Sequence, residues 1–231
     1  MVQLSWLEKA TLPVGVVASY YDPGQDRYLE ACDLGTAGLA YFEAAQLSEK
    51  LGRNGGKYLQ AAYQICDFAV RVQDGNGRFA KCWHEDGSVA IREGTVGAFL
   101  VLPLLEGYRQ SGEESYLKSA IKGTKIYLEE LKTHGFTTAG ALDIFSIDKE
   151  SGILLKASTE LYRLTGEKEW LEAARDSAWY LSTWQYTHTC HFGPSCILGQ
   201  TGYDSFGGTL VSTVHEGIDP FALCYVPELY Q

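Results

Sequence analysis

Three segments of the chain repeat one pattern, in which two amphipathic helices are separated by a short turn. The third copy is the clearest. Between Glu150 and Leu181, apolar residues recur at helical spacing on both sides of a break at Thr165-Gly166-Glu167. Two amphipathic helices joined by a few residues must lie antiparallel, and neither can cover its apolar stripe without neighbours. The sequence therefore predicts an all-α fold built from helical hairpins.

The period of the repeat limits the number of possible architectures. The second helix of each copy begins with the same short segment, and its aromatic residues Tyr58, Tyr116 and Trp170 are 58 and 54 residues apart. The segments are Lys57–Ala62, Ser115–Ala120 and Glu169–Ala174. Units of about 55 residues with two helices each are typical of an α-helical array, either an open solenoid or a closed α/α toroid.

We predict one domain over residues 1–231. It comprises a lead-in segment at 1–30, hairpins at about 33–75, 92–132 and 148–187, and a long loop with a last helix at 188–231. The first hairpin is expected to pair Gly35–Leu51 with Lys57–Gln73. Pro103 lies inside the first helix of the second hairpin and is expected to kink it.

Composition excludes two classes of partner. A formal net charge of −10 argues against nucleic acid, because nucleic-acid contact needs clustered Lys and Arg. No apolar run approaches the roughly 20 residues that span a bilayer, and the start of the chain lacks the basic and apolar regions of a signal peptide. We therefore expect no membrane partner and a cytoplasmic protein for the chain as given. A secreted or periplasmic location stays open if the chain is part of a longer protein.

Long connections between the hairpins hold most of the candidate chemistry. The returns at 74–93, 133–149 and 187–215 contain 20, 17 and 29 residues, and all five histidines of the chain lie in them. In an antiparallel array these returns emerge at the same end, and long loops on a rigid scaffold commonly carry binding and catalysis. Polar loops without a function would show part of the same pattern.

Carboxylates at the ends of these returns are the candidate catalytic residues. Glycosidic bond cleavage uses two of them, one as a general acid and one that activates water or attacks the anomeric carbon. For Glu150 and Glu216 the alternative is a structural one, since an acidic side chain at a helix N-terminus is stabilised by the macrodipole. The five candidates are Asp143, Asp148, Glu150, Glu216 and Asp219.

Aromatic and histidine side chains in or directly beside the same returns are the candidate substrate-binding residues, because ring faces stack on sugars. They are Trp83, His84, Tyr186, Tyr203 and His215. The segment Glu85-Asp86-Gly87 beside His84 has an ordinary turn as its alternative interpretation.

The cysteines give only weak evidence for a metal site. Cys190-His191 and Cys82-x-His84 offer soft ligands, but the spacing does not fit a structural zinc knuckle, and we expect no metal and no cofactor. Cys66 and Cys224 are expected to be small buried hydrophobic residues. Whether Cys190 and Cys196 are bridged is left open. Phosphate loops and nucleophile elbows are absent from the sequence.

Several segments together resemble the six-hairpin glycosidases, which are (α/α)6-toroid glycoside hydrolases. The resemblance covers about residues 33–229 and is carried by 161–174, Trp184, 148–151 and 207–219. It implies catalytic acids at the mouth where loops enter the inner helices, the place of Asp148, Glu150, Glu216 and Asp219. The chain supplies about three and a half of six hairpins, so the resemblance implies about half of an (α/α)6 barrel, with a homodimer or a missing N-terminal half as partner.

A second family shares the hairpins. Lanthionine synthetase cyclase-like proteins have inner-helix starts similar to Gly35-Thr36-Ala37-Gly38 and bind zinc through cysteines and a Cys-His pair like Cys190-His191. No cysteine lies between Cys82 and Cys190 to supply the third ligand. Our leading hypothesis is therefore a glycoside hydrolase acting on a carbohydrate. A non-catalytic module that binds a glycan or a protein is the first alternative, and zinc-dependent chemistry is the second.

Overall fold

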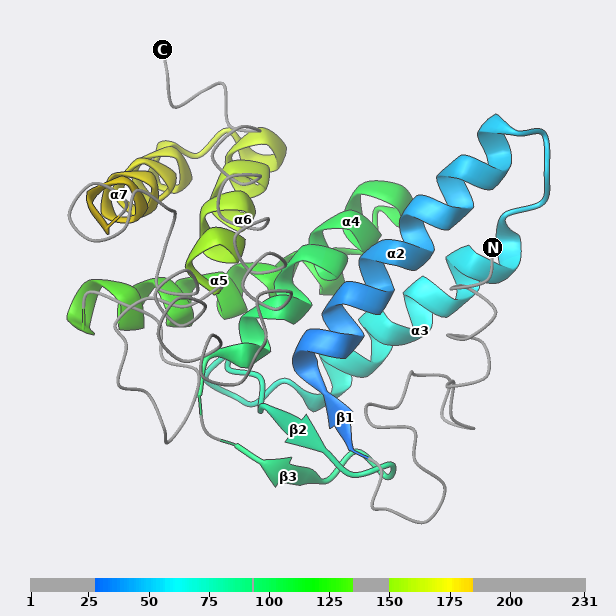
Figure 1. Cartoon of the computed structure of the whole chain (residues 1–231), viewed down its shortest axis with the longest axis horizontal. Helices are drawn as coiled ribbons and strands as arrows, with labels where there is room; N and C mark the ends of the chain where they lie inside the picture. Colours follow the sequence, from blue (N-terminus) through cyan, green and yellow to red (C-terminus); the bar gives the residue numbers. More distant parts are fainter. Residues whose placement is uncertain (1–27, 93, 135–149, 185–231) are drawn as a thin grey trace, which may run out of the picture. The chain divides into compact units, whose positions relative to one another are not determined.

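The computed structural model describes residues 28–92, 94–134 and 150–184. Its chain divides into two compact units, Met1–Gly123 and Thr124–Gln231, which are considered separately below. The described residues contain six α-helices, one 3-10 helix and three short strands (Figure 1). None of the helices in these ranges is long and apolar enough to cross a membrane. The prediction of a single domain remains a prediction.

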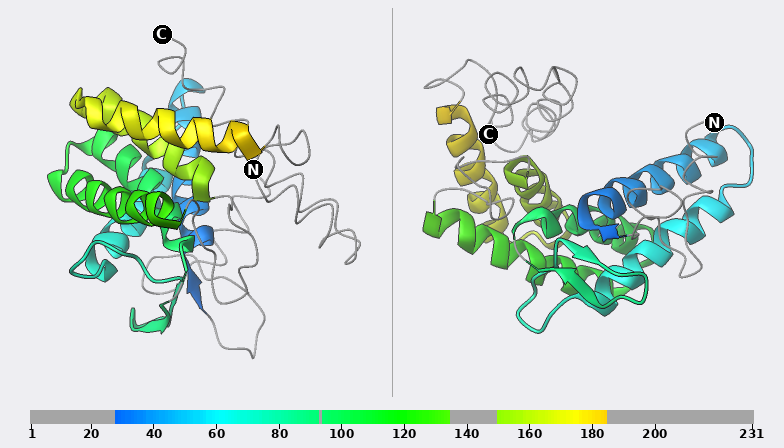
Figure 2. Two further views of the ribbon diagram at one scale, coloured as in Figure 1. Left: turned by 90° about the vertical axis from the view of Figure 1, so that its left-hand side faces the viewer. Right: turned by 60° about the horizontal axis from the view of Figure 1, so that its bottom comes forward.

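Unit 1 contains the first hairpin and most of the second. Helices α2 (Ala31–Lys50) and α3 (Gly56–Val72) pack antiparallel, as Figure 2 shows. The second hairpin starts with the 3-10 helix η1 (Val96–Leu100), continues as α4 (Val101–Ser111) and returns along α5 (Glu114–His134). Both η1 and α4 pack on α2, and α4 also packs on α3. The all-α prediction is thereby confirmed, with helix bounds within a few residues of those expected.

Unit 2 holds the end of α5 and the third hairpin, α6 (Glu150–Thr165) with α7 (Lys168–Trp184). The turn between α6 and α7 has the same glycine conformation as the turn of the second hairpin. Gly112 and Gly166 each follow the first helix with a φ of +72°, and each donates its N–H to a tyrosine carbonyl four residues earlier. Only glycine adopts this conformation without strain, so it ends the helix at the same place in both copies.

The second hairpin differs from the prediction at Pro103. The residue lies in the first turn of α4, directly after the 3-10 segment η1, rather than in the interior of one kinked α-helix. In a first turn the missing N–H of proline leaves no intrahelical hydrogen bond broken. The chain therefore accommodates Pro103 by changing helix type between Leu100 and Val101.

Two glycines let the inner helices of unit 1 approach closely. A Cβ on Gly35 would lie 2.6 Å from the carbonyl carbon of Phe99, and one on Gly38 would lie 2.9 Å from the Pro103 Cβ. Larger residues would push η1 and α4 away from α2. The small residues at the start of α2 thus fix the spacing of two successive hairpins.

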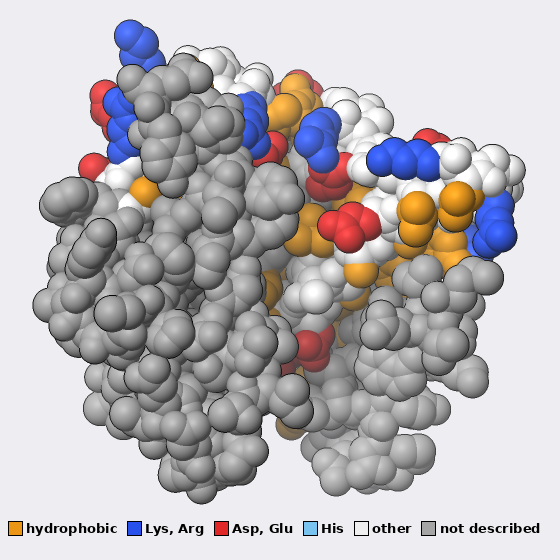
Figure 3. Space-filling view, turned by 45° about the horizontal axis from the view of Figure 1, so that its top comes forward, with side chains coloured by type: hydrophobic (Ala, Val, Ile, Leu, Met, Phe, Trp, Pro, Cys, Tyr) orange, Lys and Arg blue, Asp and Glu red, His pale blue; other side chains and the backbone are white. Residues whose placement is uncertain are grey.

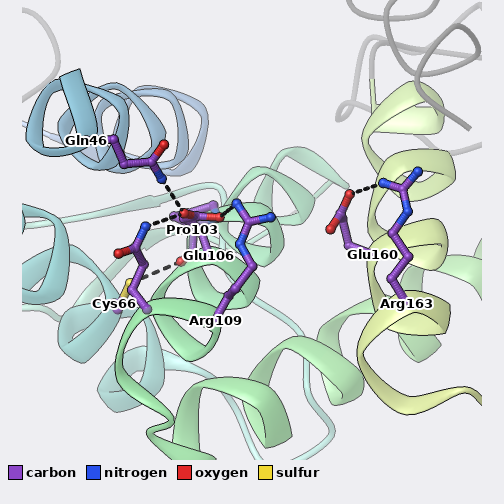
Figure 4. A network of polar contacts seen from close by, with 8 residues as sticks. Gln46, Cys66, Pro103, Glu106, Arg109, Glu160 and Arg163 are labelled. Atoms are coloured by element: carbon purple, nitrogen blue, oxygen red, sulfur yellow. Dashed lines mark hydrogen bonds and ion pairs between the residues drawn. The ribbon is translucent and has the colours of Figure 1, made fainter. Parts of the chain in front are cut away.

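A polar network holds the other end of the same helix pair (Figure 4). The Gln46 amide of α2 donates to Glu106 Oε1 of α4 over 3.0 Å, and Arg109 and Gln110 donate to the same carboxylate. Beneath it the buried Cys66 thiol of α3 donates to the Pro103 carbonyl over 3.3 Å. Helix α4 is therefore joined to α2 through Glu106 and to α3 through the Pro103 carbonyl. In unit 2, Arg163 pairs with Glu160 at the position that Arg109 and Glu106 occupy in α4.

The C-terminal end of α2 carries exposed leucines. Leu47 in its last turn and Leu51 directly after the helix are 57% and 60% exposed. Tyr58 of α3 is half-buried, while Tyr116 and Trp170 are 5% and 2% exposed. On the face drawn in Figure 3, hydrophobic side chains reach the surface among acidic and basic ones. Each later hairpin is thus better shielded than the first.

A small antiparallel sheet, absent from the prediction, precedes α2 and η1 (Figure 1). It consists of β1 (Leu29–Glu30), β2 (Cys82–Trp83) and β3 (Val89–Ile91) in that order, with Leu29 opposite Trp83 and Glu30 opposite Cys82. The turn between β2 and β3 contains Gly87 at a φ of +86°. Because Ala31, the first residue of α2, donates its N–H to the Lys81 carbonyl, the sheet adjoins the start of the first inner helix.

Candidate functional site

The first long return meets the N-terminal ends of two inner-helix segments, which is where the sequence predicts the mouth of the array. Its strands β2 and β3 pair with each other and with β1, which leads into α2, while the chain after β3 leads into η1. The prediction that all long returns share this end stays a prediction, because 135–149 and 185–215 lie outside the described residues. The sheet is therefore the part of the mouth that can be described.

One face of the sheet belongs to the core of unit 1. Leu29 and Trp83 are both 0% exposed, and the Trp83 indole meets the Phe68 ring edge-on at 5.5 Å between centroids. Trp83 Nε1 has no hydrogen-bond partner among the described residues. This burial gives Trp83 a packing role. Its predicted stacking on a sugar stays a prediction and would require the ring to be uncovered.

The other face of the sheet carries the candidate site. Side chains alternate along a strand, and paired residues of adjacent strands point to the same side. Tyr28 and Glu30 of the β1 segment therefore share a face with Cys82 and His84. The ring contact between Tyr28 and His84, with centroids 5.6 Å apart and planes tilted by 45°, agrees with this register. We call these four residues the sheet face.

The His84 end of the sheet face is held by a tight hairpin. The His84 N–H donates to the Ser88 carbonyl, and the His84 carbonyl accepts from Gly87 N–H, both over 2.9 Å. Asp86 Oδ1 accepts from the Ser88 backbone N–H at 2.8 Å and from the Ser88 hydroxyl at 2.6 Å. These hydrogen bonds, with a smaller contribution from nearby His84, lower the pKa of Asp86 below its ordinary value. The exposed His84 ring thus projects from a fixed backbone beside an ionised carboxylate.

Acidic side chains lie on and beside the sheet face, and the positive charge of Lys81 also reaches it, since it opposes the rise in the pKa of the Cys82 thiol. Half-buried Glu30 lies on the sheet face, and exposed Asp33 follows in the first turn of α2. The nearby arginines are engaged elsewhere. Arg92 pairs with Asp74 at 3.6 Å, and Arg78 donates to the Gly94 carbonyl over 2.8 Å. The site therefore combines two aromatic rings with carboxylate acceptors.

Glu30, Cys32 and Asp33 could hold a metal ion, since one ligand atom of each lies within 4.8 Å of the others. No other such group occurs within the ranges that the structure describes. Cys82, the soft ligand considered in the sequence, is protonated at neutral pH in the absence of a metal. Burial first, and then the charge of Glu30, raise the pKa of its thiol to about 11. The expectation of no metal stays a prediction, as does the zinc alternative.

Most of the predicted site residues lie outside the part of the chain that the structure describes. Of the ten, the structure describes the side chains of Trp83, the last residue of β2, and His84, the residue after it. Trp83 is buried and His84 is exposed. Glu150 is the first residue of α6, a position open to both of its interpretations. The others lie outside the described residues: Asp143, Asp148, Tyr186, Tyr203, His215, Glu216 and Asp219.

Three members of the site were not anticipated from the sequence. Tyr28, Glu30 and Asp33 precede or begin the first inner helix, about 50 residues from His84. Their proximity depends on the pairing of β1 with β2. One sequence feature could have predicted the β2–β3 hairpin. It is Asp86-Gly87, a common hairpin turn, flanked by Cys82-Trp83 and Val89-Ala90-Ile91.

Comparison with solved structures identifies the fold. Unsaturated glucuronyl hydrolase from Bacillus sp. GL1 matches with a TM-score of 0.58 and 15% identity over 76% of this chain and 52% of that one. Cellobiose 2-epimerase from Spirochaeta thermophila matches with a TM-score of 0.60 and 21% identity over 80% of this chain and 50% of that one. A family 76 mannosidase from Bacteroides thetaiotaomicron matches with a TM-score of 0.56 and 18% identity over 74% and 48%.

These proteins have the six-hairpin (α/α)6 fold, so the predicted resemblance is confirmed at the level of fold. The chain spans about half the length of the solved structures it matches. No protein-family model matches the sequence, and no curated protein does either. The described helices are thus those of an α/α-toroid array.

Proposed function

We propose that this protein is a carbohydrate-active enzyme and that it hydrolyses a glycosidic bond. The observation that carries the proposal is the combination of a six-hairpin fold with an aromatic and acidic sheet face at the start of an inner helix. The similar solved structures include a glucuronyl hydrolase and mannosidases, which supports a carbohydrate as substrate. At this level of identity they support the class of substrate rather than the sugar.

The proposed mechanism uses two carboxylates of the mouth. One protonates the glycosidic oxygen, and the other either attacks the anomeric carbon or activates water. Asp148, Glu150, Glu216 and Asp219 are our candidates, with Asp143 as a fifth. Carboxyl groups about 5–5.5 Å apart would give retention of configuration, and a separation of about 6.5–9.5 Å would give inversion. The stereochemistry of the product thus reports their spacing.

Epimerisation is the second candidate, because two of the epimerase structures cover more of this chain than the hydrolases do. A sugar epimerase from a ruminal bacterium and a cellobiose 2-epimerase from Bacillus thermoamylovorans match 94% and 95% of it, each with a TM-score of 0.61. The hydrolases match 73–85%. Inverting a sugar carbon next to a carbonyl needs a group that removes and returns a proton, and histidine is well suited near neutral pH. His84 and His215 are the candidates.

One experiment separates these functions. The chain is incubated in D₂O with a panel of disaccharides and p-nitrophenyl glycosides, and NMR follows monosaccharide release and deuterium incorporation at carbon 2. Monosaccharide or nitrophenol release, abolished by Asp148→Asn or Asp219→Asn, supports hydrolysis. Deuterium incorporation with an intact glycosidic bond supports epimerisation. Glycan binding without either signal would refute an enzyme and leave a binding module, and no binding at all would refute a carbohydrate ligand.

In this proposal a six-hairpin ring is completed in one of two ways. The further hairpins belong either to a second copy of the chain or to a longer protein. Sedimentation at increasing concentration distinguishes the two, since only the first predicts a dimer of this chain.

A further inference from the structure

We infer that α3 carries a second carbohydrate-binding site, apart from the sheet face, which holds a glycan chain through the hydroxyl groups of its sugar units. The inference rests on the proposed function, because that function supplies the class of ligand. The site lies on the exposed side of α3. The observations behind it are a hollow, the chemistry of its lining, and a difference between the three copies of the outer helix.

The hollow has a volume of about 400 Å³ and follows one side of α3. This volume falls within the range of about 300–1,000 Å³ that ligand pockets occupy. The lining residues recur at helical spacing over about three turns, and they are Gly56, Leu59, Gln60, Tyr63, Gln64 and Asp67. The sheet adjoins the start of α2, and α3 starts after the turn at the other end of that helix. The hollow therefore begins at the end of the hairpin opposite the sheet face.

Two apolar side chains of the hollow are held in place. Leu59 and Tyr63 are both half-buried, so part of each side chain remains open to the hollow. The Tyr63 ring stacks on Tyr116, with centroids 6.3 Å apart and planes at 23°, and it meets the Phe42 ring edge-on at 5.7 Å. These neighbours fix the Tyr63 ring. It therefore offers a preformed apolar contact to the C–H groups of a sugar.

Three polar side chains of the same hollow match sugar hydroxyl groups. The Gln60 and Gln64 side chains are exposed and one turn apart, and neither amide bonds to another residue in the described part of the chain. An amide group both donates and accepts hydrogen bonds, as a hydroxyl does. Asp67 Oδ1 accepts from the Tyr116 hydroxyl over 2.6 Å, which orients the carboxylate and leaves it further positions for accepting hydrogen bonds.

The positions of Gln60 and Gln64 are charged in the other two outer helices. The offsets of 58 and 54 residues between the copies give their counterparts, which are Lys118 and Lys122 in α5, and Glu172 and Asp176 in α7. All four are exposed. Charged side chains are the usual cover of the solvent-facing side of a helix. An amide pair beside a leucine and a tyrosine thus distinguishes α3 from the ordinary outer face of this array.

The test observes the site directly by NMR of the 15N-labelled 231-residue chain. The side-chain amide signals of Gln60 and Gln64 are assigned from their loss in the two single alanine variants. The chain is then titrated with cellotetraose, mannotetraose and xylotetraose. We expect saturable shifts of both signals with at least one of the three. A titration to about 10 mM ligand also detects weak binding, since a Kd of about 1 mM then gives an occupancy of about nine-tenths.

Matched variants test the proposed contacts, with binding followed by the Leu59 methyl signals. The double variant Gln60→Ala/Gln64→Ala should weaken binding about fivefold or more, because two hydrogen-bonding groups are lost. The control Lys118→Ala/Lys122→Ala removes two exposed side chains at the equivalent positions of α5. It should leave the affinity unchanged.

The absence of a saturable shift of either amide with all three oligosaccharides would overturn the inference, as would a double glutamine variant that binds as tightly as the parent chain. Failure of the proposed function gives a different result. Shifts at α3 without turnover of any glycoside refute the enzyme and retain the binding site, whereas turnover without these shifts refutes the binding site alone.

Discussion

The close approach of the first two inner helices at Gly35 gives a sharp stability prediction. In Gly35→Ala, the new methyl group would lie 2.6 Å from the carbonyl carbon of Phe99 and closer still to its oxygen. An ordinary contact between carbon atoms is about 3.5 Å, so η1 and α2 would have to separate by roughly 0.9 Å. The obstacle is backbone, which cannot rotate away as a side chain can.

The expected magnitude follows from two opposing effects. Replacing a helical glycine with alanine stabilises a helix by up to about 1 kcal/mol. Overpacking costs about 1–3 kcal/mol, and a rigid backbone neighbour favours the upper end. We therefore expect a net loss of about 2 kcal/mol. With a urea m-value of about 2 kcal/mol/M, the unfolding midpoint should fall by about 1 M.

The assay is urea unfolding followed by far-UV circular dichroism and by tryptophan fluorescence, which includes buried Trp83 of the same unit. Gly75→Ala is the matched control, since a Cβ there meets nothing within 4 Å and the residue does not have a positive φ. Its midpoint should move by less than about 0.3 M, from a change within about 0.5 kcal/mol. A Gly35→Ala midpoint equal to or above that of the parent would refute the packing argument.

Three further predictions concern the core and the outer helices. Burial is the main cause of the raised pKa of the Cys66 and Cys82 thiols, so their contribution to stability is present below about pH 9 and is lost as the pH rises toward 11. Urea unfolding at pH 8 and pH 10.5 should show the loss, and the double alanine variant should reduce it. Tyr116→Phe removes a 2.6 Å hydrogen bond to Asp67 and should cost about 1 kcal/mol in the same assay; no change would mean that water replaces the bond. Lys125→Ala breaks an ion pair whose side chains are more than half exposed, and should cost less than about 1 kcal/mol; a larger loss would contradict that exposure.

The helices could be predicted because sequence patterns within each helix and its turn specify them. Apolar spacing and the glycines after each first helix place the hairpins, and the structure puts Gly112 and Gly166 in the same conformation. Pro103 was misjudged since its effect depends on where the 3-10 segment ends, which the sequence does not mark. Strands of two and three residues are too short to show an alternating pattern, so the sheet was missed.

The candidate site was predictable only in part, for a related reason. His84 was selected because it lies in a long return, and the structure places it on the sheet face with Tyr28. The partnership of Tyr28 with His84 depends on strand register across more than 50 residues, which no local pattern encodes. Trp83 was selected by the same rule as His84, yet alternation along β2 turns it into the core.

The exposed C-terminal end of α2 determines where local unfolding of unit 1 should begin. A hydrogen-bonded backbone amide exchanges with deuterium only after a local opening, and openings start where few side chains pack on an element. Leu47 is exposed and Tyr58 is half-buried, whereas Tyr116, the equivalent of Tyr58 in the second hairpin, is buried. Fraying should therefore begin in the C-terminal turns of α2 and the first turn of α3, while the amides of α4 remain protected between the helices around them.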